Sequence, residues 1–379
     1  MTSAAVGGAA AELKFRDPAK ARELAGALAR VCADIGRNPI TLMHVCGSHE
    51  QAIAKYGLRS NFPAALDVIM GPGCPVCVTD LPEVDEAVVL AAQGARIVTY
   101  GDMLRVPGTA QSLLEAQAEG GNVDVIYSAA QAVDLAREHA EESVVFFATG
   151  FETTAVATAA IALRDDLPPN FSILSAHKYI PPAMEIVAEM PQTRVEGFLA
   201  AGHAATITGW GIFERFVEKH GLPVVVAGFE PLDILAGLVQ LVELVRDGKA
   251  QVANAFPRCV TREGNRNAQR QLWQVFRTSG GMWRGIAHIP NGNLRLRDEF
   301  AHLDTRRRFD IDLRRFWSTA PAALTQQCIC GDIMSGIASP FDCPLFGKQC
   351  LPDTPVGACM VSNEGTCKIW HTYGGRPKV

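Results

Sequence analysis

The chain has 379 residues, of which 48% are hydrophobic and 7% aromatic, and its formal net charge is −5. This length allows two or three domains with large aliphatic cores. The weakly acidic charge argues against electrostatic binding of nucleic acid. No stretch has the pattern of a secretory signal or a membrane span, so we expect a cytoplasmic protein without a membrane segment.

The first part of the chain predicts one helix followed by a repeating α/β pattern. Apolar residues recur at helical spacing between residues 12 and 35, which indicates a helix. From residue 39 to about residue 247, short β-branched runs alternate with glycine-bearing turns and helical segments, which is typical of parallel βαβ units. The predicted strands are Ile40–Val45, Leu66–Met70, Arg96–Tyr100, Val123–Tyr127, Val144–Ala148, Phe171–Ser175, Val195–Ala200 and Pro223–Ala227.

The helix between the second and third strands has the clearest signals. Asp80 or Thr79 can cap it, Pro82 lies in its first turn, and Gly94 ends it. Eight strands are many for one open sheet. We therefore expect two similar parallel-sheet α/β domains, residues 38–140 and 141–247, that face a cleft. Residues 12–37 and 248–379 are expected to form a third, irregular and cysteine-rich domain.

Residues with reactive or metal-binding side chains fall on the turns that follow the predicted strands. Parallel strands bring these turns to one edge of a sheet, where ligands bind. Cys46 and His49 follow the first strand, Cys74 and Cys77 the second, and Asp102 the third. The sequence thus predicts a cleft that collects thiol, imidazole and carboxylate groups.

Two of these turns suggest specific chemistry. Cys74 and Cys77 form a Cys-x-x-Cys motif between a strand and a helix, where the helix N-terminus lowers a thiol pKa. A redox dithiol is the preferred interpretation, ahead of a metal site and of simple packing. Cys46 and His49 could bind iron or form a nucleophile–base pair, although a single cysteine at a strand end more often only packs.

Six of the eleven cysteines lie in the last fifty or so residues, among Gly, Pro and Asp: Cys328, Cys330, Cys343, Cys350, Cys359 and Cys367. In a reducing compartment such a cluster is more often metal-binding than disulfide-bonded. Four thiolates are enough for a cubane iron–sulfur cluster, which leaves two of the six for thiol–disulfide chemistry.

Several motifs together resemble the HypD family of hydrogenase formation proteins. They are Cys46-Gly47-Ser48-His49-Glu50, Gly71-Pro72-Gly73-Cys74-Pro75-Val76-Cys77, residues 101–108 (GDMLRVPG), Gly150-Phe151-Glu152-Thr153-Thr154, Cys343-Pro344-Leu345-Phe346-Gly347 and residues 357–362 (GACMVS). The likeness covers nearly the whole chain.

This resemblance implies a scaffold on which the Fe(CN)₂CO group of [NiFe]-hydrogenases is built, with redox, electron-transferring chemistry; whether it is an enzyme stays open. It implies a HypC-like chaperone that shares the iron and a HypE-like cyanide donor as partners. Cys46 would bind the iron with help from His49, and Cys74 and Cys77 would be a dithiol near it.

The resemblance also implies that the C-terminal cysteines hold a [4Fe–4S] cluster. The assigned ligands are Cys328, Cys343, Cys350 and Cys367, and the relay dithiol is Cys330 and Cys359. Such a cluster with adjacent thiols can supply the electrons that cyanide transfer requires. Glu364 could handle protons, and a solvated loop carboxylate is the alternative. Two other functions stay open, an iron–sulfur thiol–disulfide reductase and a structural zinc protein.

Overall fold

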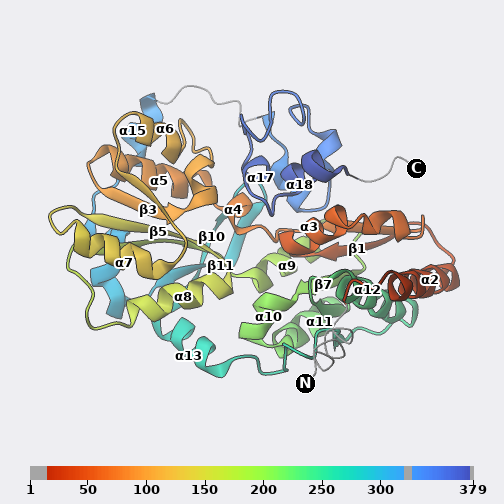
Figure 1. The fold of residues 1–379 in the computed structure, drawn as a ribbon. Coiled ribbons are helices and arrows are strands. Elements are labelled where there is room, and N and C mark those ends of the chain that lie inside the picture. Colours follow the sequence, from red (N-terminus) through yellow and green to blue (C-terminus); the bar gives the residue numbers. More distant parts are fainter. Residues whose placement is uncertain (1–14, 320–326, 376–379) are drawn as a thin grey trace, which may run out of the picture.

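Two parallel β-sheets form the framework of the computed structural model, which describes residues 15–319 and 327–375 (Figure 1). The strands of the five-stranded sheet run in the order β2 (Leu66–Met70), β1 (Ile40–His44), β7 (Gly197–Ala201), β8 (Val224–Ala227) and β9 (Val252–Asn254). Those of the four-stranded sheet run β4 (Val123–Ile126), β3 (Arg96–Tyr100), β5 (Val144–Gly150) and β6 (Phe171–His177). All neighbouring strands within these two sheets pair in parallel.

The predicted fold class is confirmed, and each of the eight predicted strands is present within two residues of its predicted ends. The predicted boundary between residues 140 and 141 does not separate the sheets. β1 and β2 pair with β7 to β9 from the second half of the chain, while β3 to β6 form the other sheet. Each sheet is thus assembled from strands on both sides of that boundary, because strand pairing depends on tertiary contacts that local sequence patterns do not encode.

Helices cover both faces of the five-stranded sheet. Apolar side chains of α2 (Pro18–Ile35), α3 (Gly47–Lys55) and α12 (Pro231–Arg246) pack on one face, and those of α9 (Ile180–Glu189) and α11 (Glu214–His220) pack on the other. The sequence assigned residues 12–37 to the third domain, but the described part of that segment packs on α12 instead. Leu28 and Val31 of α2 are buried in this core. The free energy gained by burying these apolar side chains decides where the helix packs, and position along the chain does not.

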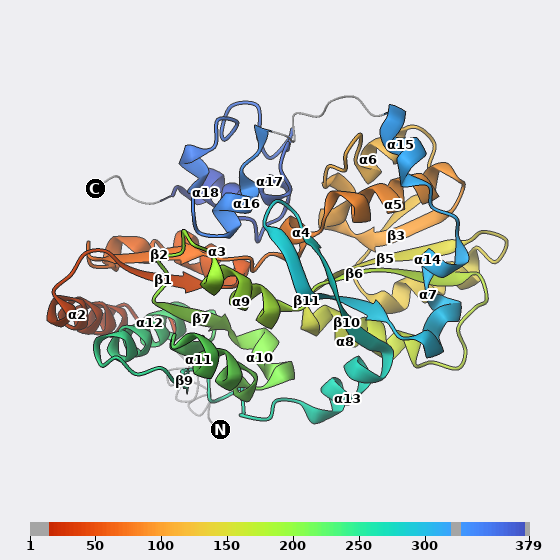
Figure 2. The same cartoon turned by 180° about the vertical axis from the view of Figure 1, so that it is seen from behind.

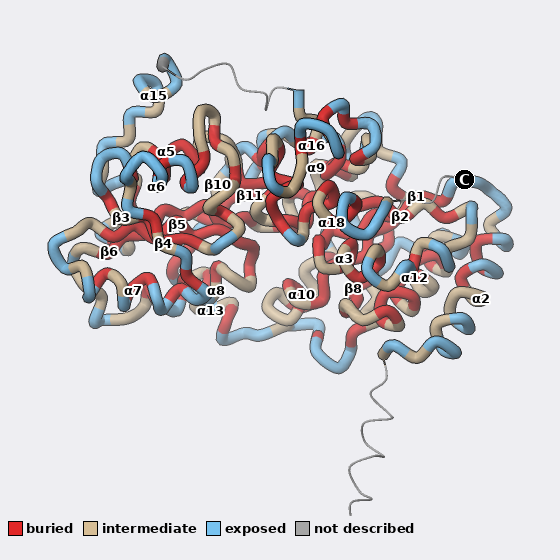
Figure 3. Tube along the Cα trace, turned by 45° about the horizontal axis from the view of Figure 1, so that its top comes forward, coloured by how far each residue is buried: buried red, intermediate tan, exposed pale blue. Residues whose placement is uncertain are grey.

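The four-stranded sheet is covered in the same way. One face packs against α5 (Leu81–Ala92) and α6 (Leu113–Ala118), and the other against α7 (Ala129–Glu138), α8 (Glu152–Ala162) and α13 (Arg266–Val275). Asp80 is the N-cap of α5, as predicted, and the Glu83 carboxylate accepts the Asp80 backbone N–H at 3.1 Å. The central strands of both sheets are buried (Figure 3).

A hairpin of β10 (Phe276–Trp283) and β11 (Ala287–Leu296) lies between the two sheets (Figure 2). The sequence predicted an irregular domain here, because the segment lacks the strand–turn–helix pattern of the preceding residues. Two adjacent glycines and Pro290 interrupt the alternation of these strands and hide them from sequence patterns. The register shifts between Ser279 and Gly281. The buried Lys178, after β6, contacts Asn293 of the hairpin at 3.0 Å and Glu83 of α5 at 2.7 Å. These contacts fix the hairpin against the four-stranded sheet.

The cysteine-rich region contains α16 (Cys330–Met334), α17 (Ala358–Val361) and α18 (Thr366–Tyr373), and it is irregular between them, as predicted. α18 contacts α3, and α17 contacts the short α4 (Pro75–Val78). The remaining helices are α10 (Gly202–Thr208), α14 (Thr305–Arg308) and α15 (Leu313–Thr319), with 3₁₀ segments η1 (Leu58–Asn61), η2 (Gly101–Arg105), η3 (Trp210–Phe213), η4 (Asp298–Leu303) and η6 (Pro340–Asp342). Within residues 15–319 and 327–375, no helix has the length and apolar character needed to cross a membrane.

Candidate functional site

Cys46 lies at the carboxyl end of β1 and is the N-cap residue of α3. Its side chain is 1% exposed. The Cys46 Sγ lies 4.0 Å from Nδ1 of His203, which stands at the start of α10 directly after β7. Because β1 and β7 are neighbours in the sheet, the two turns bring a thiol and an imidazole together from positions 157 residues apart.

The surroundings of Cys46 keep its sulfur protonated. Burial raises the pKa of the Cys46 thiol to about 12, and the negative charge of Glu364 also raises it. The backbone N–H groups of His49 and Ser48 at the start of α3 oppose this shift without overcoming it. A metal ion that binds here must therefore displace a proton from sulfur.

His49 lies in the first turn of α3 and is fully buried. Its Nε2 donates a hydrogen bond to the carbonyl oxygen of Gly228 at 2.9 Å, and its ring lies 4.8 Å from that of Phe229. Burial lowers the pKa of His49 to about 3, so the imidazole is neutral. Its Nδ1 has no hydrogen-bond partner within the described parts of the chain. A neutral imidazole with a free nitrogen is suited to bind metal, and the role assigned to His49 stays a prediction.

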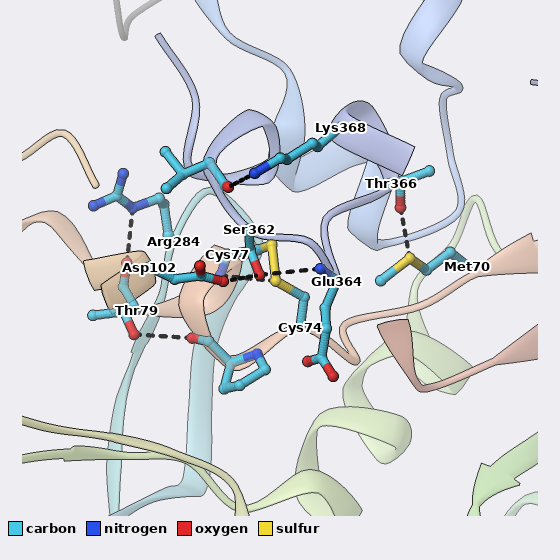
Figure 4. Close-up of a disulfide and its surroundings, with 12 residues drawn as sticks. Met70, Cys74, Cys77, Thr79, Asp102, Arg284, Ser362, Glu364, Thr366 and Lys368 are labelled. Carbon is cyan, nitrogen blue, oxygen red and sulfur yellow. Dashed lines mark hydrogen bonds between the residues drawn. A yellow bond between two sulfur atoms is a disulfide. The ribbon is translucent and has the colours of Figure 1, made fainter. Parts of the chain in front are cut away.

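Cys74 and Cys77 follow β2 and form a disulfide (Figure 4). Both are fully buried. The turn that carries them packs backbone to backbone against the Cys46 turn, since Gly47 N–H donates to Gly73 O at 3.1 Å. A Cβ atom on Gly73 would lie 2.2 Å from the Cys46 backbone nitrogen, so this approach requires glycine. The structure thus brings the two predicted thiol-bearing turns into direct contact.

A chain of hydrogen bonds runs past the disulfide toward the Cys46 turn. Ser362 Oγ donates to Asp102 Oδ2 at 2.9 Å, and it accepts the backbone N–H of Glu364 at 3.1 Å (Figure 4). Ser48 Oγ, two residues after Cys46, donates to Glu364 Oε1 at 3.0 Å. Burial raises the pKa of Glu364, and the nearby Asp102 charge adds to that shift. Glu364 is therefore no solvated loop carboxylate.

The six C-terminal cysteines gather in one region. Five of them are buried and Cys328 is half-buried. A hydrogen bond with Cys330 and burial raise the pKa of Cys328, and a hydrogen bond with Cys359 and burial raise that of Cys367. Each of the two predicted relay cysteines thus lies beside one predicted cluster ligand.

The chemistry of this region fits a thiolate-bound cluster. The Cys350 Sγ accepts the Val356 backbone N–H at 3.3 Å, which is the kind of bond that tunes cluster thiolates. A Cβ atom on Gly357 would lie 2.5 Å from the Cys328 Sγ, so glycine leaves room for that sulfur. A cavity of about 180 Å³ is lined by Cys328, Cys330, Gly357 and the buried Arg284, among others.

Sequence reasoning missed His203 and the two serines as parts of the site. His203 stands in one of the strand-end turns, so the signal was present, but a lone histidine is usually a packed core residue. Its significance comes from the distance to Cys46. Ser48 and Ser362 have no sequence signal that separates them from other turn serines, because their partners lie 316 and 260 residues away.

Comparison with known proteins identifies relatives along most of the chain. A family model described as HypD, hydrogenase formation hypA family, matches residues 19–374. A putative hydrogenase expression/formation protein of Methanocaldococcus jannaschii is 43% identical over 88% of this chain and 92% of its own length. The hydrogenase maturation factors HypD of Azotobacter vinelandii and Cupriavidus necator are 42% and 40% identical, each over 95% of this chain and 96% of its own length. The chain therefore belongs to the HypD family of hydrogenase formation proteins.

Proposed function

We propose that this protein acts in the maturation of [NiFe]-hydrogenases, as the scaffold on which the Fe(CN)₂CO group is assembled. Its relatives are named hydrogenase maturation factors. The observation that carries the proposal is the contact between the Cys46 turn and the turn of the Cys74–Cys77 pair, at adjacent strand ends of one sheet. A metal-binding thiol and a two-electron dithiol are there held side by side.

In this proposal iron is the substrate, and Cys46 is the residue that binds it. His203, 4.0 Å from the sulfur, and His49, with its unpaired Nδ1, are the neutral imidazoles available to support it. Iron binding releases the thiol proton. Glu364, whose pKa is raised and which accepts from Ser48, is a carboxylate positioned to receive that proton.

The dithiol and the C-terminal cysteines provide the redox part. Reduction of the Cys74–Cys77 disulfide consumes two electrons and two protons and gives two thiols. Glu364, whose pKa is raised and which is joined to Asp102 through Ser362, lies beside the disulfide and can pass protons to it (Figure 4).

A [4Fe–4S] cluster would be held by Cys328, Cys343, Cys350 and Cys367, and it would supply single electrons. Cys330 and Cys359 each lie beside one of these ligands and are suited to exchange with a dithiol. The partners we propose are a HypC-like chaperone that shares the iron and a HypE-like cyanide donor, all acting in the cytoplasm.

Infrared spectroscopy tests the scaffold directly. The protein, purified without oxygen together with its HypC-like partner, should be brown and should show bands of iron-bound cyanide and CO. Cys46→Ala should lose these bands and keep the brown colour. Cys32→Ala is the matched control, because Cys32 is a buried cysteine of α2, and it should keep both.

A second function is an iron–sulfur thiol–disulfide reductase, which the Cys74–Cys77 disulfide favours. This function requires the cluster and the dithiols but no iron at Cys46. Bands that persist in Cys46→Ala would remove Cys46 from the scaffold role. A brown protein without any such bands, in the presence of the partner, would favour the reductase.

A further inference from the structure

Three potential metal ligands from α9 and α11 meet on the side of the five-stranded sheet that these helices cover. Glu185 and Glu189 stand one turn apart on α9, and His220 is the last residue of α11. One ligand atom from each lies within 4.8 Å of the other two. Within the described residues, no other set of three His, Cys, Asp or Glu side chains is as closely spaced.

His220 lies within ion-pair distance of both glutamates but makes no hydrogen bond to either of them. Its side chain is 9% exposed, and its ring lies 4.7 Å from that of Phe216. Its Nε2 has no hydrogen-bond partner within the described residues and lies 4.0 Å from Glu185 and 3.9 Å from Glu189. A buried polar atom without a partner is costly, so a nitrogen directed at two carboxylates indicates a missing ligand.

A cation already occupies the carboxylate side of this group. Lys219 Nζ lies 2.7 Å from Glu185 and 2.9 Å from Glu189. Its side chain is 49% exposed and can swing into solvent, so a metal ion can replace the ammonium group. A divalent ion would neutralise both carboxylates and would also bind the lone pair of the His220 nitrogen, to which Lys219 makes no hydrogen bond.

We propose that Glu185, Glu189 and His220 form a binding site for a first-row divalent metal ion, with Lys219 as the competing cation. Two carboxylates and an imidazole suit Mn²⁺, Fe²⁺ or Zn²⁺. Bonds of about 2.1 Å to an ion would bring the ligand atoms to roughly 3.4 Å from one another, which small side-chain rotations of the half-exposed glutamates allow. Water would fill the remaining positions.

The position of the site suggests what bound metal does. α9 is the segment through which the chain passes from β6 of the four-stranded sheet to β7 of the five-stranded sheet. A metal ion that joins α9 to α11 fixes this crossing to the five-stranded sheet, independently of the chemistry at Cys46. This role does not depend on the proposed scaffold function.

Manganese is the probe for the test, because thiolates prefer softer metals and the cysteines then compete little. Full-length protein is titrated with Mn²⁺, and free Mn²⁺ is measured by electron paramagnetic resonance. Pulsed measurements on the bound ion then detect coupling to an imidazole nitrogen. We expect one bound ion with nitrogen coupling, and loss of that coupling in His220→Gln.

Three variants complete the test. Glu189→Gln should weaken binding at least about tenfold, since even changes to residues that only hydrogen-bond to a metal ligand cost this much. Lys219→Met should tighten it, a gain that misfolding cannot produce. Asp298→Asn removes one exposed carboxylate elsewhere, on a residue paired with Arg307, and should leave binding unchanged. Equal Mn²⁺ binding by wild type and Glu189→Gln, or bound Mn²⁺ without nitrogen coupling, would overturn the proposal.

Discussion

The buried carboxylate of Glu50 offers the sharpest test of how the cysteine-rich region is held against the five-stranded sheet and its helices. Glu50 lies in α3 and is fully buried. Its two oxygens accept hydrogen bonds from His44 at 2.7 Å, from Arg59 at 2.9 Å and from Trp370 of α18 at 2.7 Å, and Arg59 makes a second ion-pair contact at 2.8 Å. One side chain thus joins β1, α3, η1 and α18.

Substitution of Glu50 by Gln keeps the shape and removes the charge. The Arg59 side chain, 10% exposed, would then be a nearly buried cation without a charged partner, although it would keep its hydrogen bond to the Val68 carbonyl oxygen. Breaking a buried pair in this way costs about 3–5 kcal/mol of unfolding free energy. The exposed pair of Glu214 and Arg262 is the matched control, and Glu214→Gln should cost less than about 1 kcal/mol.

Urea unfolding at neutral pH, followed by circular dichroism, measures both variants. Burial alone would raise the pKa of Glu50, but the charges and hydrogen bonds of Arg59 and His44 outweigh it, so the pKa is lowered from 4.5. A carboxyl group with a lowered pKa stabilises the folded state fully at pH values above 4.5, and this stabilisation is lost progressively as the pH falls below 4.5. The difference between wild type and Glu50→Gln should therefore shrink below that pH.

A double variant separates charge from packing. Adding Arg59→Met to Glu50→Gln removes the unpaired cation, so part of the lost stability should return. A loss in Glu50→Gln no larger than that in Glu214→Gln would refute the argument that this buried pair holds α18 on α3.

Three further predictions concern the site and its supports. Gly47→Ala places a Cβ atom 2.4 Å from Glu364, so the unfolding free energy, measured by thermal unfolding, should fall by about 1–3 kcal/mol. Gly101→Ala is the control, because its Cβ atom would meet nothing closer than 3.5 Å and the unfolding free energy should not change. Burial raises the pKa of Glu152 from 4.5 to about 7, so the unfolding free energy of the wild type should fall as the pH rises between these values. Glu152→Gln should remove this pH dependence and should be more stable than the wild type by up to about 3 kcal/mol at pH 8. An unchanged pH dependence in the variant would contradict this reasoning. Because iron binding at Cys46 releases one proton, its affinity should increase about tenfold for each unit by which the pH rises, as long as the pH is below the thiol pKa of about 12. Titrations at pH 6.5, 7.5 and 8.5 measure this dependence. An affinity that does not change with pH would show that the thiol is already ionised.

Local sequence patterns were enough to predict strands β1 to β8, but not β9 or the hairpin. β-branched runs and glycine-bearing turns located all eight predicted strands, and the cap and proline near residue 80 located the start of α5. These signals are local, because strand alternation and helix capping act over a few residues. The hairpin of β10 and β11 was missed because glycines and a register shift break its alternation.

The site could be predicted in its residue types but not in its assembly. That Cys46 and the Cys74–Cys77 pair stand on strand-end turns follows from the sequence, as does the gathering of six cysteines near the C-terminus. His203 beside Cys46, and Glu364 reached through Ser48, became visible only in three dimensions.

The sequence by itself therefore determined strands β1 to β8, helices such as α2 and α5, and the turns that carry thiols, imidazoles and carboxylates. Only the tertiary structure decided that β1 pairs with β7, that α2 packs on α12, and that α18 rests on α3. The physical reason is that these choices depend on burying apolar faces and pairing charges between segments far apart in the chain. The packing of α18 on α3 is one example, because it depends on the buried charge of Glu50, whose hydrogen-bond partner Trp370 lies 320 residues away.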